Sequence, residues 1–177
     1  RYGAQEVLHR QQGPEFNWYR SINNDPRNWA NTQIRLQDFT WKQAEDKKSV
    51  TVIAELEAII GKVNVPHTIT YTIHGNGAID IKASFKPGTD FNLPRLALQT
   101  SLNPALDKIT WFGRGPIENY QDRKNAAYIG LYSTTVEDMR EYYVRTQSMG
   151  ERCDSRWLTL TNNHGKGIKI TPEGTID

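Results

Sequence analysis

The sequence has few of the residues that build metal and redox sites. It contains one cysteine, Cys153, and four histidines. A single cysteine excludes an internal disulfide and a cysteine-rich zinc site. Because no activating base lies near it in the sequence, we expect Cys153 to be a small buried apolar residue. The histidines lack the i, i+3 or i+4 spacing of metal ligands on one helix; they are His9, His67, His74 and His164.

Long apolar runs and blocks of one charge are also absent. No apolar run approaches the roughly 20 residues that span a bilayer, so we expect no membrane partner. The 22 basic and 20 acidic residues are interspersed, unlike the basic patch of a nucleic-acid-binding protein, and we expect no nucleic-acid partner. With 37% hydrophobic and 24% charged residues, the composition is that of a folded chain. The length predicts one domain, residues 1–177.

What the sequence has in abundance is period-two alternation of apolar and polar residues. Between residues 50 and 60 the apolar side chains at even positions share one side: Val50, Val52, Ala54, Leu56, Ala58 and Ile60. From residue 67 to residue 85 the alternation continues on both sides of His74-Gly75-Asn76-Gly77. These four residues tolerate the positive φ that a tight turn requires. We therefore predict a β-hairpin at this point.

Further strands are predicted over residues 34–41, 95–102 and 108–112, and a late pair over residues 156–161 and 167–171. Short alternating strands separated by turns favour an all-β, antiparallel sandwich over a parallel sheet. Only residues 125–132 and 136–142 fit a short helix. Otherwise residues 113–143 have the weak pattern of a functional or docking loop. Because the sequence ends directly after a predicted strand, we expect a sandwich truncated at its C-terminal end.

An acidic pair is the most conspicuous candidate for chemistry. Glycoside hydrolysis uses two carboxyl groups on either side of the scissile bond, and Glu118 and Asp122 lie close together in GRGPIENYQDR. The alternative is a structural loop in which Arg114 or Arg123 pairs with one of these carboxylates and Tyr120 packs beneath. We favour the structural interpretation, because 20 acidic residues supply such pairs by chance.

A segment rich in aromatic and amide side chains covers residues 16–29, FNWYRSINNDPRNW. Such a composition suits sugar recognition, because aromatic faces bind the apolar faces of sugar rings and planar polar groups bind hydroxyls. The alternative is that its Asn, Asp and Pro residues build turns, while Trp18 and Trp29 anchor the loop to the core. The composition of the segment leaves both interpretations open.

Three longer motifs occur in a fixed order: GPEFNWYRSINND at residues 13–25, WFGRGPIENYQDRKNAAYIGLY at residues 111–132, and MGERCDSRWLTLTN at residues 149–162. They resemble, in turn, the FWRAPTDND, W-G-x-GP-x-ENY-x-DR and ENG-x-R-x-x-x-RW segments of the large bacterial β-galactosidases of glycoside hydrolase family 2. The resemblance is to their C-terminal domain and extends from about Tyr2 to the end of the sequence. Among the departures, Tyr19 replaces a tryptophan and Asn23 a threonine of the first motif.

The resemblance implies a super-sandwich of two antiparallel sheets, similar to galactose mutarotase, that follows a catalytic (β/α)8 barrel. In the family the catalytic glutamates lie in that barrel, so the resemblance implies no catalytic residue in this chain and no activity of the chain alone. The family's first loop reaches the active site, which implies a substrate-binding role for Arg20, Asn23, Asn24 and Asp25. We expect no metal or cofactor in this part; the parent enzyme is expected to use Mg²⁺ and Na⁺ in other domains and to form a homo-oligomer.

The implied function is the non-catalytic sandwich portion of a bacterial β-galactosidase, a retaining glycoside hydrolase acting on terminal β-D-galactosides such as lactose. Its partners would be the galactoside and the barrel of the same polypeptide. Two other functions are considered: an independent carbohydrate-binding module, which needs a groove of exposed aromatics, and a mutarotase-like epimerase, which needs paired His and Glu. The first ten residues lack the pattern of a signal peptide, and the compartment stays open between bacterial cytoplasm and periplasm.

Overall fold

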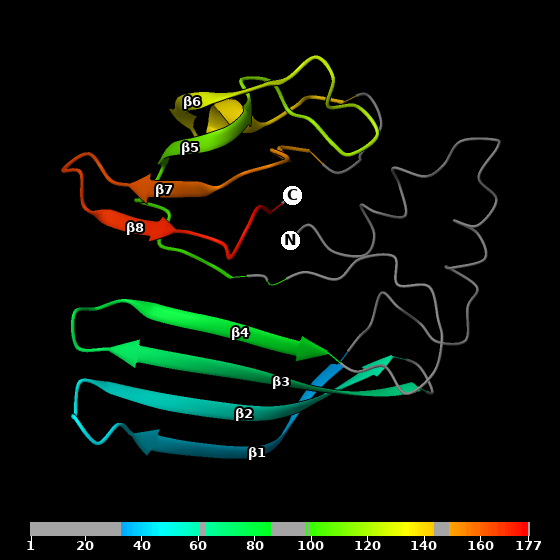
Figure 1. The fold of residues 1–177 in the computed structure, drawn as a ribbon. Coiled ribbons are helices and arrows are strands. Elements are labelled where there is room, and N and C mark those ends of the chain that lie inside the picture. Colours follow the sequence, from blue (N-terminus) through cyan, green and yellow to red (C-terminus); the bar gives the residue numbers. More distant parts are fainter. Residues whose placement is uncertain (1–32, 61–62, 86–97, 99, 144–148, 177) are drawn as a thin grey trace. The chain divides into compact units, whose positions relative to one another are not determined.

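The structure is a computed structural model that describes residues 33–60, 63–85, 98, 100–143 and 149–176. The protein divides into two compact units, residues 1–95 and residues 96–177. Within the described residues each unit holds one four-stranded antiparallel sheet, and the one helical element there is the 3-10 turn η2 (Glu137–Met139). Figure 1 shows both sheets. The predicted all-β, antiparallel fold with two sheets is therefore confirmed.

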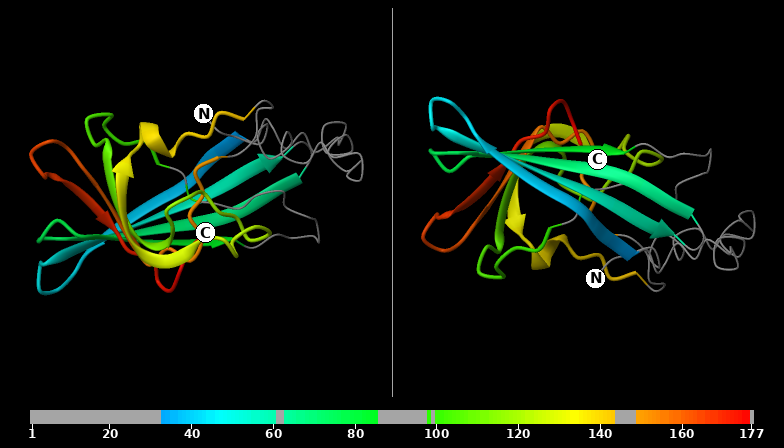
Figure 2. Two further views of the ribbon diagram at one scale, coloured as in Figure 1. Left: turned by 90° about the horizontal axis from the view of Figure 1, so that it is seen from above. Right: turned by 90° about the horizontal axis from the view of Figure 1, so that it is seen from below.

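The first sheet is a meander in which strands that follow one another in the sequence are also neighbours in space. Its strands are β1 (Gln33–Gln43), β2 (Ser49–Ile60), β3 (Val63–His74) and β4 (Ile79–Phe85), in the order β1-β2-β3-β4. Figure 2 shows the twist of these strands from two sides. The predicted hairpin joins β3 to β4, and His74 closes it by donating from its backbone N–H to the Ala78 carbonyl at 2.9 Å.

The register of the first sheet separates apolar from polar side chains. Trp41 pairs with Val52, Val52 with Tyr71, and Tyr71 with Ile81. Because side chains alternate across a strand, these four residues share one face, whereas the opposite face carries threonines and charged residues. A β-bulge between Leu36 and Asp38 shifts the register of β1 and keeps the apolar residues before and after it on the same face.

The second sheet has a different connectivity. Its strands are β5 (Lys108–Gly115), β6 (Tyr128–Thr135), β7 (Trp157–Thr161) and β8 (Gly167–Ile170), in the order β6-β5-β7-β8. Strand β5 is central, pairing with β6 on one side and β7 on the other. The loops that leave β5 and enter β7 therefore meet at the same end of the sheet, and this brings residues 116–127 close to residues 149–156 (Figure 1).

Trp111 lies at the centre of the second sheet and is 2% exposed. Its ring packs against Tyr132 on β6, with ring centroids 5.4 Å apart. Gly115 permits this packing: a Cβ at that position would lie 2.7 Å from Tyr132 and 3.0 Å from Trp111. Small residues at β5 thus make room for large aromatic rings. The other buried apolar residues in the described part of this unit are Ile109, Tyr120, Ala127 and Cys153.

The predictions for residues 95–143 are partly wrong. Residues 128–135 form strand β6, not the helix predicted over residues 125–132, and the helix predicted over residues 136–142 is reduced to η2. Within the predicted strand 95–102, the described residues Thr100 to Leu102 are not in a strand. The strands predicted over residues 108–112, 156–161 and 167–171 correspond to β5, β7 and β8. The predicted extent of the domain, residues 1–177, stays a prediction.

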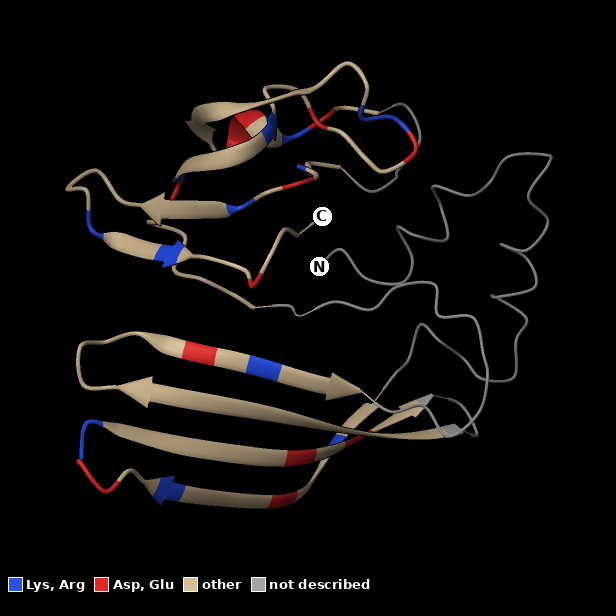
Figure 3. Cartoon of the chain, in the orientation of Figure 1, with Lys and Arg blue, Asp and Glu red and all other residues tan. Residues whose placement is uncertain are grey.

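Acidic and basic residues are scattered along the described part of both units, without a basic block on either sheet (Figure 3). Within the described residues, no helix has the length and apolar character needed to cross a membrane.

Candidate functional site

A cluster of polar side chains lies where the loop after β5 meets the segment before β7. Glu118 is 7% exposed and Asn119 is 0% exposed, although both residues are polar. Buried polar groups must find hydrogen-bond partners within the protein, because leaving one unsatisfied costs about 1–3 kcal/mol. The partners of these two residues therefore show what the cluster does.

Glu118 uses both carboxylate oxygens within the protein. Its Oε1 accepts hydrogen bonds from the Arg123 guanidinium and the Tyr143 hydroxyl, and its Oε2 accepts one from the Gly150 N–H at 2.9 Å. The Arg123 guanidinium in turn lies 4.6 Å from the centroid of the Tyr120 ring. The carboxylate thus ties the loop after β5 to Tyr143 and to Gly150, which are seven positions apart in the sequence.

Asn119 connects the same loop to the segment before β7. Its Oδ1 accepts a hydrogen bond from the Cys153 N–H at 2.8 Å, and its Nδ2 donates to the Ile117 carbonyl at 3.0 Å. Its backbone N–H donates to the Glu151 carbonyl at 3.0 Å. Cys153 is 0% exposed, with its Sγ 3.6 Å from the Asn119 carbonyl oxygen. The prediction that Cys153 is a small buried residue is confirmed.

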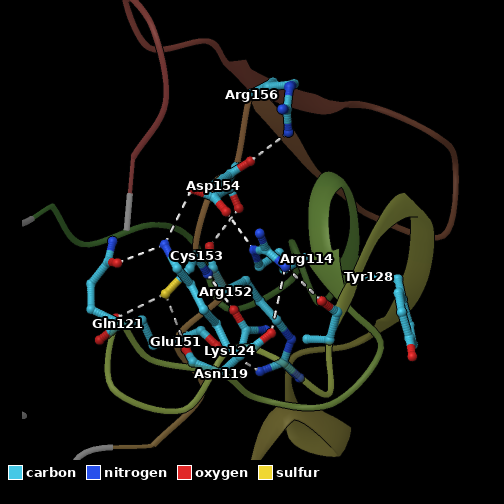
Figure 4. A network of polar contacts seen from close by, with 12 residues as sticks. Arg114, Asn119, Gln121, Lys124, Tyr128, Glu151, Arg152, Cys153, Asp154 and Arg156 are labelled. Carbon is cyan, nitrogen blue, oxygen red and sulfur yellow. Dashed lines mark hydrogen bonds and ion pairs between the residues drawn. The ribbon is translucent and has the colours of Figure 1, made fainter.

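Arg114 and Asp154 form the second centre of the cluster, shown in Figure 4. Arg114 donates from Nε to the Asp154 carboxylate and from Nη1 to the Ala127 carbonyl at 2.8 Å. The Lys124 ammonium lies 3.8 Å from the other Asp154 oxygen. Asp154 has a φ of 55°, a left-handed conformation that aspartate tolerates better than most residues. Arg114 thus holds the end of β5, the start of β6 and Asp154 together.

The pKa of Asp154 lies below its ordinary value, chiefly because Arg114 donates a hydrogen bond to the carboxylate. The positive charges of Lys124, Arg114 and Arg156 lower it further, whereas burial opposes them. A carboxyl group whose pKa is depressed on folding stabilises the fold fully above its unfolded-state pKa of about 3.9. That contribution is lost as the pH falls through the lower pKa of the folded state.

We therefore expect the Asp154→Asn variant to have a lower urea midpoint than the wild type at pH 7. The difference should begin to shrink below about pH 4, where the carboxyl group of the unfolded wild type takes up a proton. It should vanish only below the lower pKa of the folded state, where the carboxyl group is protonated in both states. Urea unfolding at a series of pH values, followed by circular dichroism, measures this difference. A difference in urea midpoint that stays constant from neutral to strongly acidic pH would contradict the stabilising role of the Arg114–Asp154 ion pair.

Arg152 covers the ring at the centre of the unit. Its guanidinium lies 5.3 Å from the Trp111 ring, and Nη1 donates to the Glu151 carbonyl at 3.0 Å. Burial lowers the pKa of Arg152 from its ordinary value, and the negative charges of Glu118 and Glu141 oppose that shift. Arginine remains charged at any pH at which proteins fold, so a positive charge faces the aromatic core beside the Glu118 carboxylate.

This geometry is suited to holding loops together. A catalytic acid/base or nucleophile needs a carboxylate facing its substrate, but both Glu118 oxygens accept hydrogen bonds from the protein itself. The predicted pairing is confirmed for Glu118, whose partner is Arg123, with the Tyr120 ring packed against that arginine. That this chain holds no catalytic residue stays a prediction. Arg114 pairs with Asp154, a partner that the sequence did not suggest.

The predicted substrate-binding residues stay a prediction. Arg20, Asn23, Asn24 and Asp25 lie outside the described residues, as do Trp18 and Trp29. Among the residues that the structure does describe, no group of three or more His, Cys, Asp or Glu side chains is arranged to hold a metal ion.

The fold and the cluster define an all-β protein whose conspicuous acidic motif serves its architecture. The chain belongs to the β-galactosidase small-chain family, whose family model matches residues 1–174. It is 32% identical to a β-galactosidase of Priestia megaterium over 187 aligned residues, covering 99% of this chain and 18% of that protein. It is 31% identical to a β-galactosidase of Lactobacillus delbrueckii subsp. bulgaricus, covering 98% of this chain and 18% of that protein.

A third relative is a β-galactosidase of Vibrio cholerae, 29% identical with 77% of this chain and 14% of that protein covered. The chain thus spans less than a fifth of the length of these relatives. The family predicted from the three sequence motifs is confirmed.

Proposed function

We propose that this chain is a non-catalytic sheet portion of a β-galactosidase, an enzyme that hydrolyses terminal β-D-galactosides of the lactose type. The observation that carries the proposal is the family match over residues 1–174, together with relatives named β-galactosidase that align over nearly all of the chain. The remaining four fifths of such a protein have room for a (β/α)8 barrel, which needs about 250 residues. We place the catalytic carboxylates in that barrel.

Within the parent enzyme, the chain supports the barrel and contributes the loop with Arg20, Asn23, Asn24 and Asp25 to the galactoside site. The hydrogen bonds of Glu118 support this division of labour, because both oxygens of the buried carboxylate in the most conspicuous acidic motif are taken up by donors of the protein itself. The parent is proposed to be a homo-oligomer with its Mg²⁺ and Na⁺ sites in other domains and no cofactor in this portion.

The 177-residue chain by itself is expected to show no turnover of o-nitrophenyl β-D-galactoside, whereas the full polypeptide that contains it should hydrolyse the substrate.

In that full polypeptide, Asn24→Ala should raise KM for the galactoside by about tenfold, the effect of losing roughly 1.4 kcal/mol of binding, with a smaller change in kcat. A matched control is Asn125→Ala, which removes an exposed asparagine near β6 and should leave KM unchanged. Steady-state kinetics of the three proteins measure these effects.

Two outcomes would contradict this assignment in different ways. Turnover by the purified chain that disappears in Glu118→Gln would place catalysis in the chain itself. Equal KM values for the Asn24→Ala and Asn125→Ala enzymes would leave the β-galactosidase assignment intact but remove the loop from the substrate site.

A further inference from the structure

The hairpin between β3 and β4 carries a chemically reactive pair of residues. Asn76–Gly77 is the one Asn–Gly pair in the 177 residues. Asparagine is a thermolabile residue, and its commonest reaction is attack on the side-chain amide carbon by the backbone nitrogen of the following residue. Gly77 offers that nitrogen without a side chain in the way. The space around it is also open, because a Cβ built on Gly77 would have no atom within 4 Å apart from its chain neighbours.

The turn also orders the Asn76 side chain. The Ala78 N–H donates to Asn76 Oδ1 at 3.0 Å, an Asx turn that holds the side-chain amide beside the backbone of the residues that follow it. Asn76 is exposed, so water reaches the site. One contact opposes the reaction, because the Gly77 N–H donates to the His74 carbonyl at 3.0 Å and must be released first.

Two other asparagines in the described part of the protein provide internal comparisons. Asn162 Oδ1 accepts from the His164 N–H at 2.9 Å, and Asn103 Oδ1 accepts from the Ala105 N–H at 2.9 Å. Both side chains therefore share with Asn76 the hydrogen bond to the N–H two residues further on, and Asn162 Oδ1 accepts a second one from the Lys166 N–H at 3.1 Å. The residue that follows also differs: it is Asn163 in one case and Pro104 in the other. A side chain hinders the attacking nitrogen at residue 163, and proline has no N–H to lose.

We propose that Asn76 is a spontaneous modification site, at which the protein deamidates to aspartate and isoaspartate. Solvent base removes the Gly77 amide proton, and the nitrogen bonds to Cγ of Asn76. The bond between Cγ and the amide nitrogen Nδ2 breaks and ammonia leaves, which closes a five-membered succinimide. Water then opens the ring. Attack at Cγ gives aspartate, and attack at the backbone carbonyl carbon of residue 76 gives isoaspartate; the net reaction is hydrolysis of an amide, without oxidation or reduction.

The two products affect the hairpin differently. Aspartate keeps an oxygen that accepts from the Ala78 N–H. Isoaspartate adds a methylene to the backbone. The present turn cannot take up this extra length, because two hydrogen bonds close it: the His74 N–H donates to the Ala78 carbonyl, and the Gly77 N–H donates to the His74 carbonyl. Amide hydrogen exchange at His74 and Gly77 should therefore quicken in the isoaspartate form.

The test is incubation of the 177-residue protein in warm, mildly alkaline buffer, followed by peptide mapping with mass spectrometry. The Asn76 peptide should gain the mass of the NH₂-to-OH exchange at least about tenfold faster than the Asn162 peptide, because only Asn76 is followed by a residue without a side chain. Cleavage by a protease specific for aspartate separates the two products, since it does not cut at isoaspartate.

A second variant tests the proposal at another turn and leaves the hairpin between β3 and β4 unchanged. Asn163→Gly gives Asn162 an unhindered neighbour at an exposed position, and deamidation at Asn162 should then accelerate towards the rate of Asn76. Equal rates at Asn76 and Asn162 in the wild-type protein would overturn the proposal. So would an Asn163→Gly variant that leaves Asn162 as slow as before.

Discussion

Replacing Glu118 with alanine is expected to lower the free energy of unfolding of the second unit by about 3 kcal/mol. The substitution leaves the Gly150 N–H without its acceptor and the Arg123 guanidinium without its partner. Because the Glu118 side chain is 5% exposed, water does not readily replace the lost contacts. The Arg123 side chain is 44% exposed, which keeps the loss below the upper end of the range for a buried ion pair. Urea unfolding followed by circular dichroism measures the change.

A second glutamate–arginine pair in the same unit is the matched control. Glu137 lies 3.2 Å from Arg140, but its side chain is 68% exposed. Exposed pairs of this kind contribute about 0–1 kcal/mol, so Glu137→Ala should have little effect. A loss of similar size in the Glu137→Ala and Glu118→Ala variants would show that the buried carboxylate has no special role.

The contribution of the Tyr143 hydroxyl is separated by a double-mutant cycle of Glu118→Gln and Tyr143→Phe. Glutamine keeps the shape of Glu118 but not its charge, and phenylalanine removes only the hydroxyl that donates to Oε1. Because one change removes the charge of the acceptor and the other removes the donor of the same contact, the double variant should be less destabilised than the sum of the two single variants. Strict additivity would contradict a direct Glu118–Tyr143 bond.

The first sheet was predictable from the sequence because its determinants are local. Period-two alternation gives the strand and its apolar side at once, and the turn residues at positions 74–77 give the hairpin. Each strand also pairs with the next one in the sequence, so no long-range information was needed. The β-bulge at residues 36–38 leaves no such signal, because one extra residue looks like a short lapse in the alternation.

Strand β6 was missed because its environment is set by a distant partner. Residues 128–135 alternate poorly: Ile129 and Leu131 lie on the same face as Ser133. The segment becomes a strand by pairing residue by residue with β5, from Gly115–Tyr128 to Lys108–Thr135. Strand propensity depends strongly on such neighbours, which one sequence cannot supply.

The two ion pairs of the polar cluster also differ in whether the sequence predicts them. The Glu118–Arg123 pair spans five positions within one motif, and it was among the pairs considered from the sequence. The Arg114–Asp154 pair spans 40 positions. It forms because β5 pairs with β7, so the end of β5 lies beside the residues before β7. Only the topology of the sheet makes that contact visible.

Trp111→Ala is expected to cost about 4 kcal/mol of unfolding free energy, the largest effect of any substitution proposed for this protein. The indole is 2% exposed and packs against Tyr132 and beneath Arg152. Its Nε1–H also donates to the Arg114 carbonyl at 2.9 Å. Removing the ring therefore leaves a cavity at the centre of the sheet and an unsatisfied carbonyl at the end of β5.

Trp111→Phe separates the two causes, because it keeps most of the aromatic packing and removes the hydrogen bond. Its expected cost is about 1–2 kcal/mol.

Trp41→Ala is the control for loss of a tryptophan as such. Trp41 on β1 is 67% exposed, and its removal should cost about 1 kcal/mol or less, since little of its surface is buried. Urea unfolding followed by far-ultraviolet circular dichroism suits all three variants, because tryptophan fluorescence changes with the substitutions themselves. A Trp111→Ala protein as stable as Trp41→Ala would mean that Trp111 is not the centre of the second unit's core.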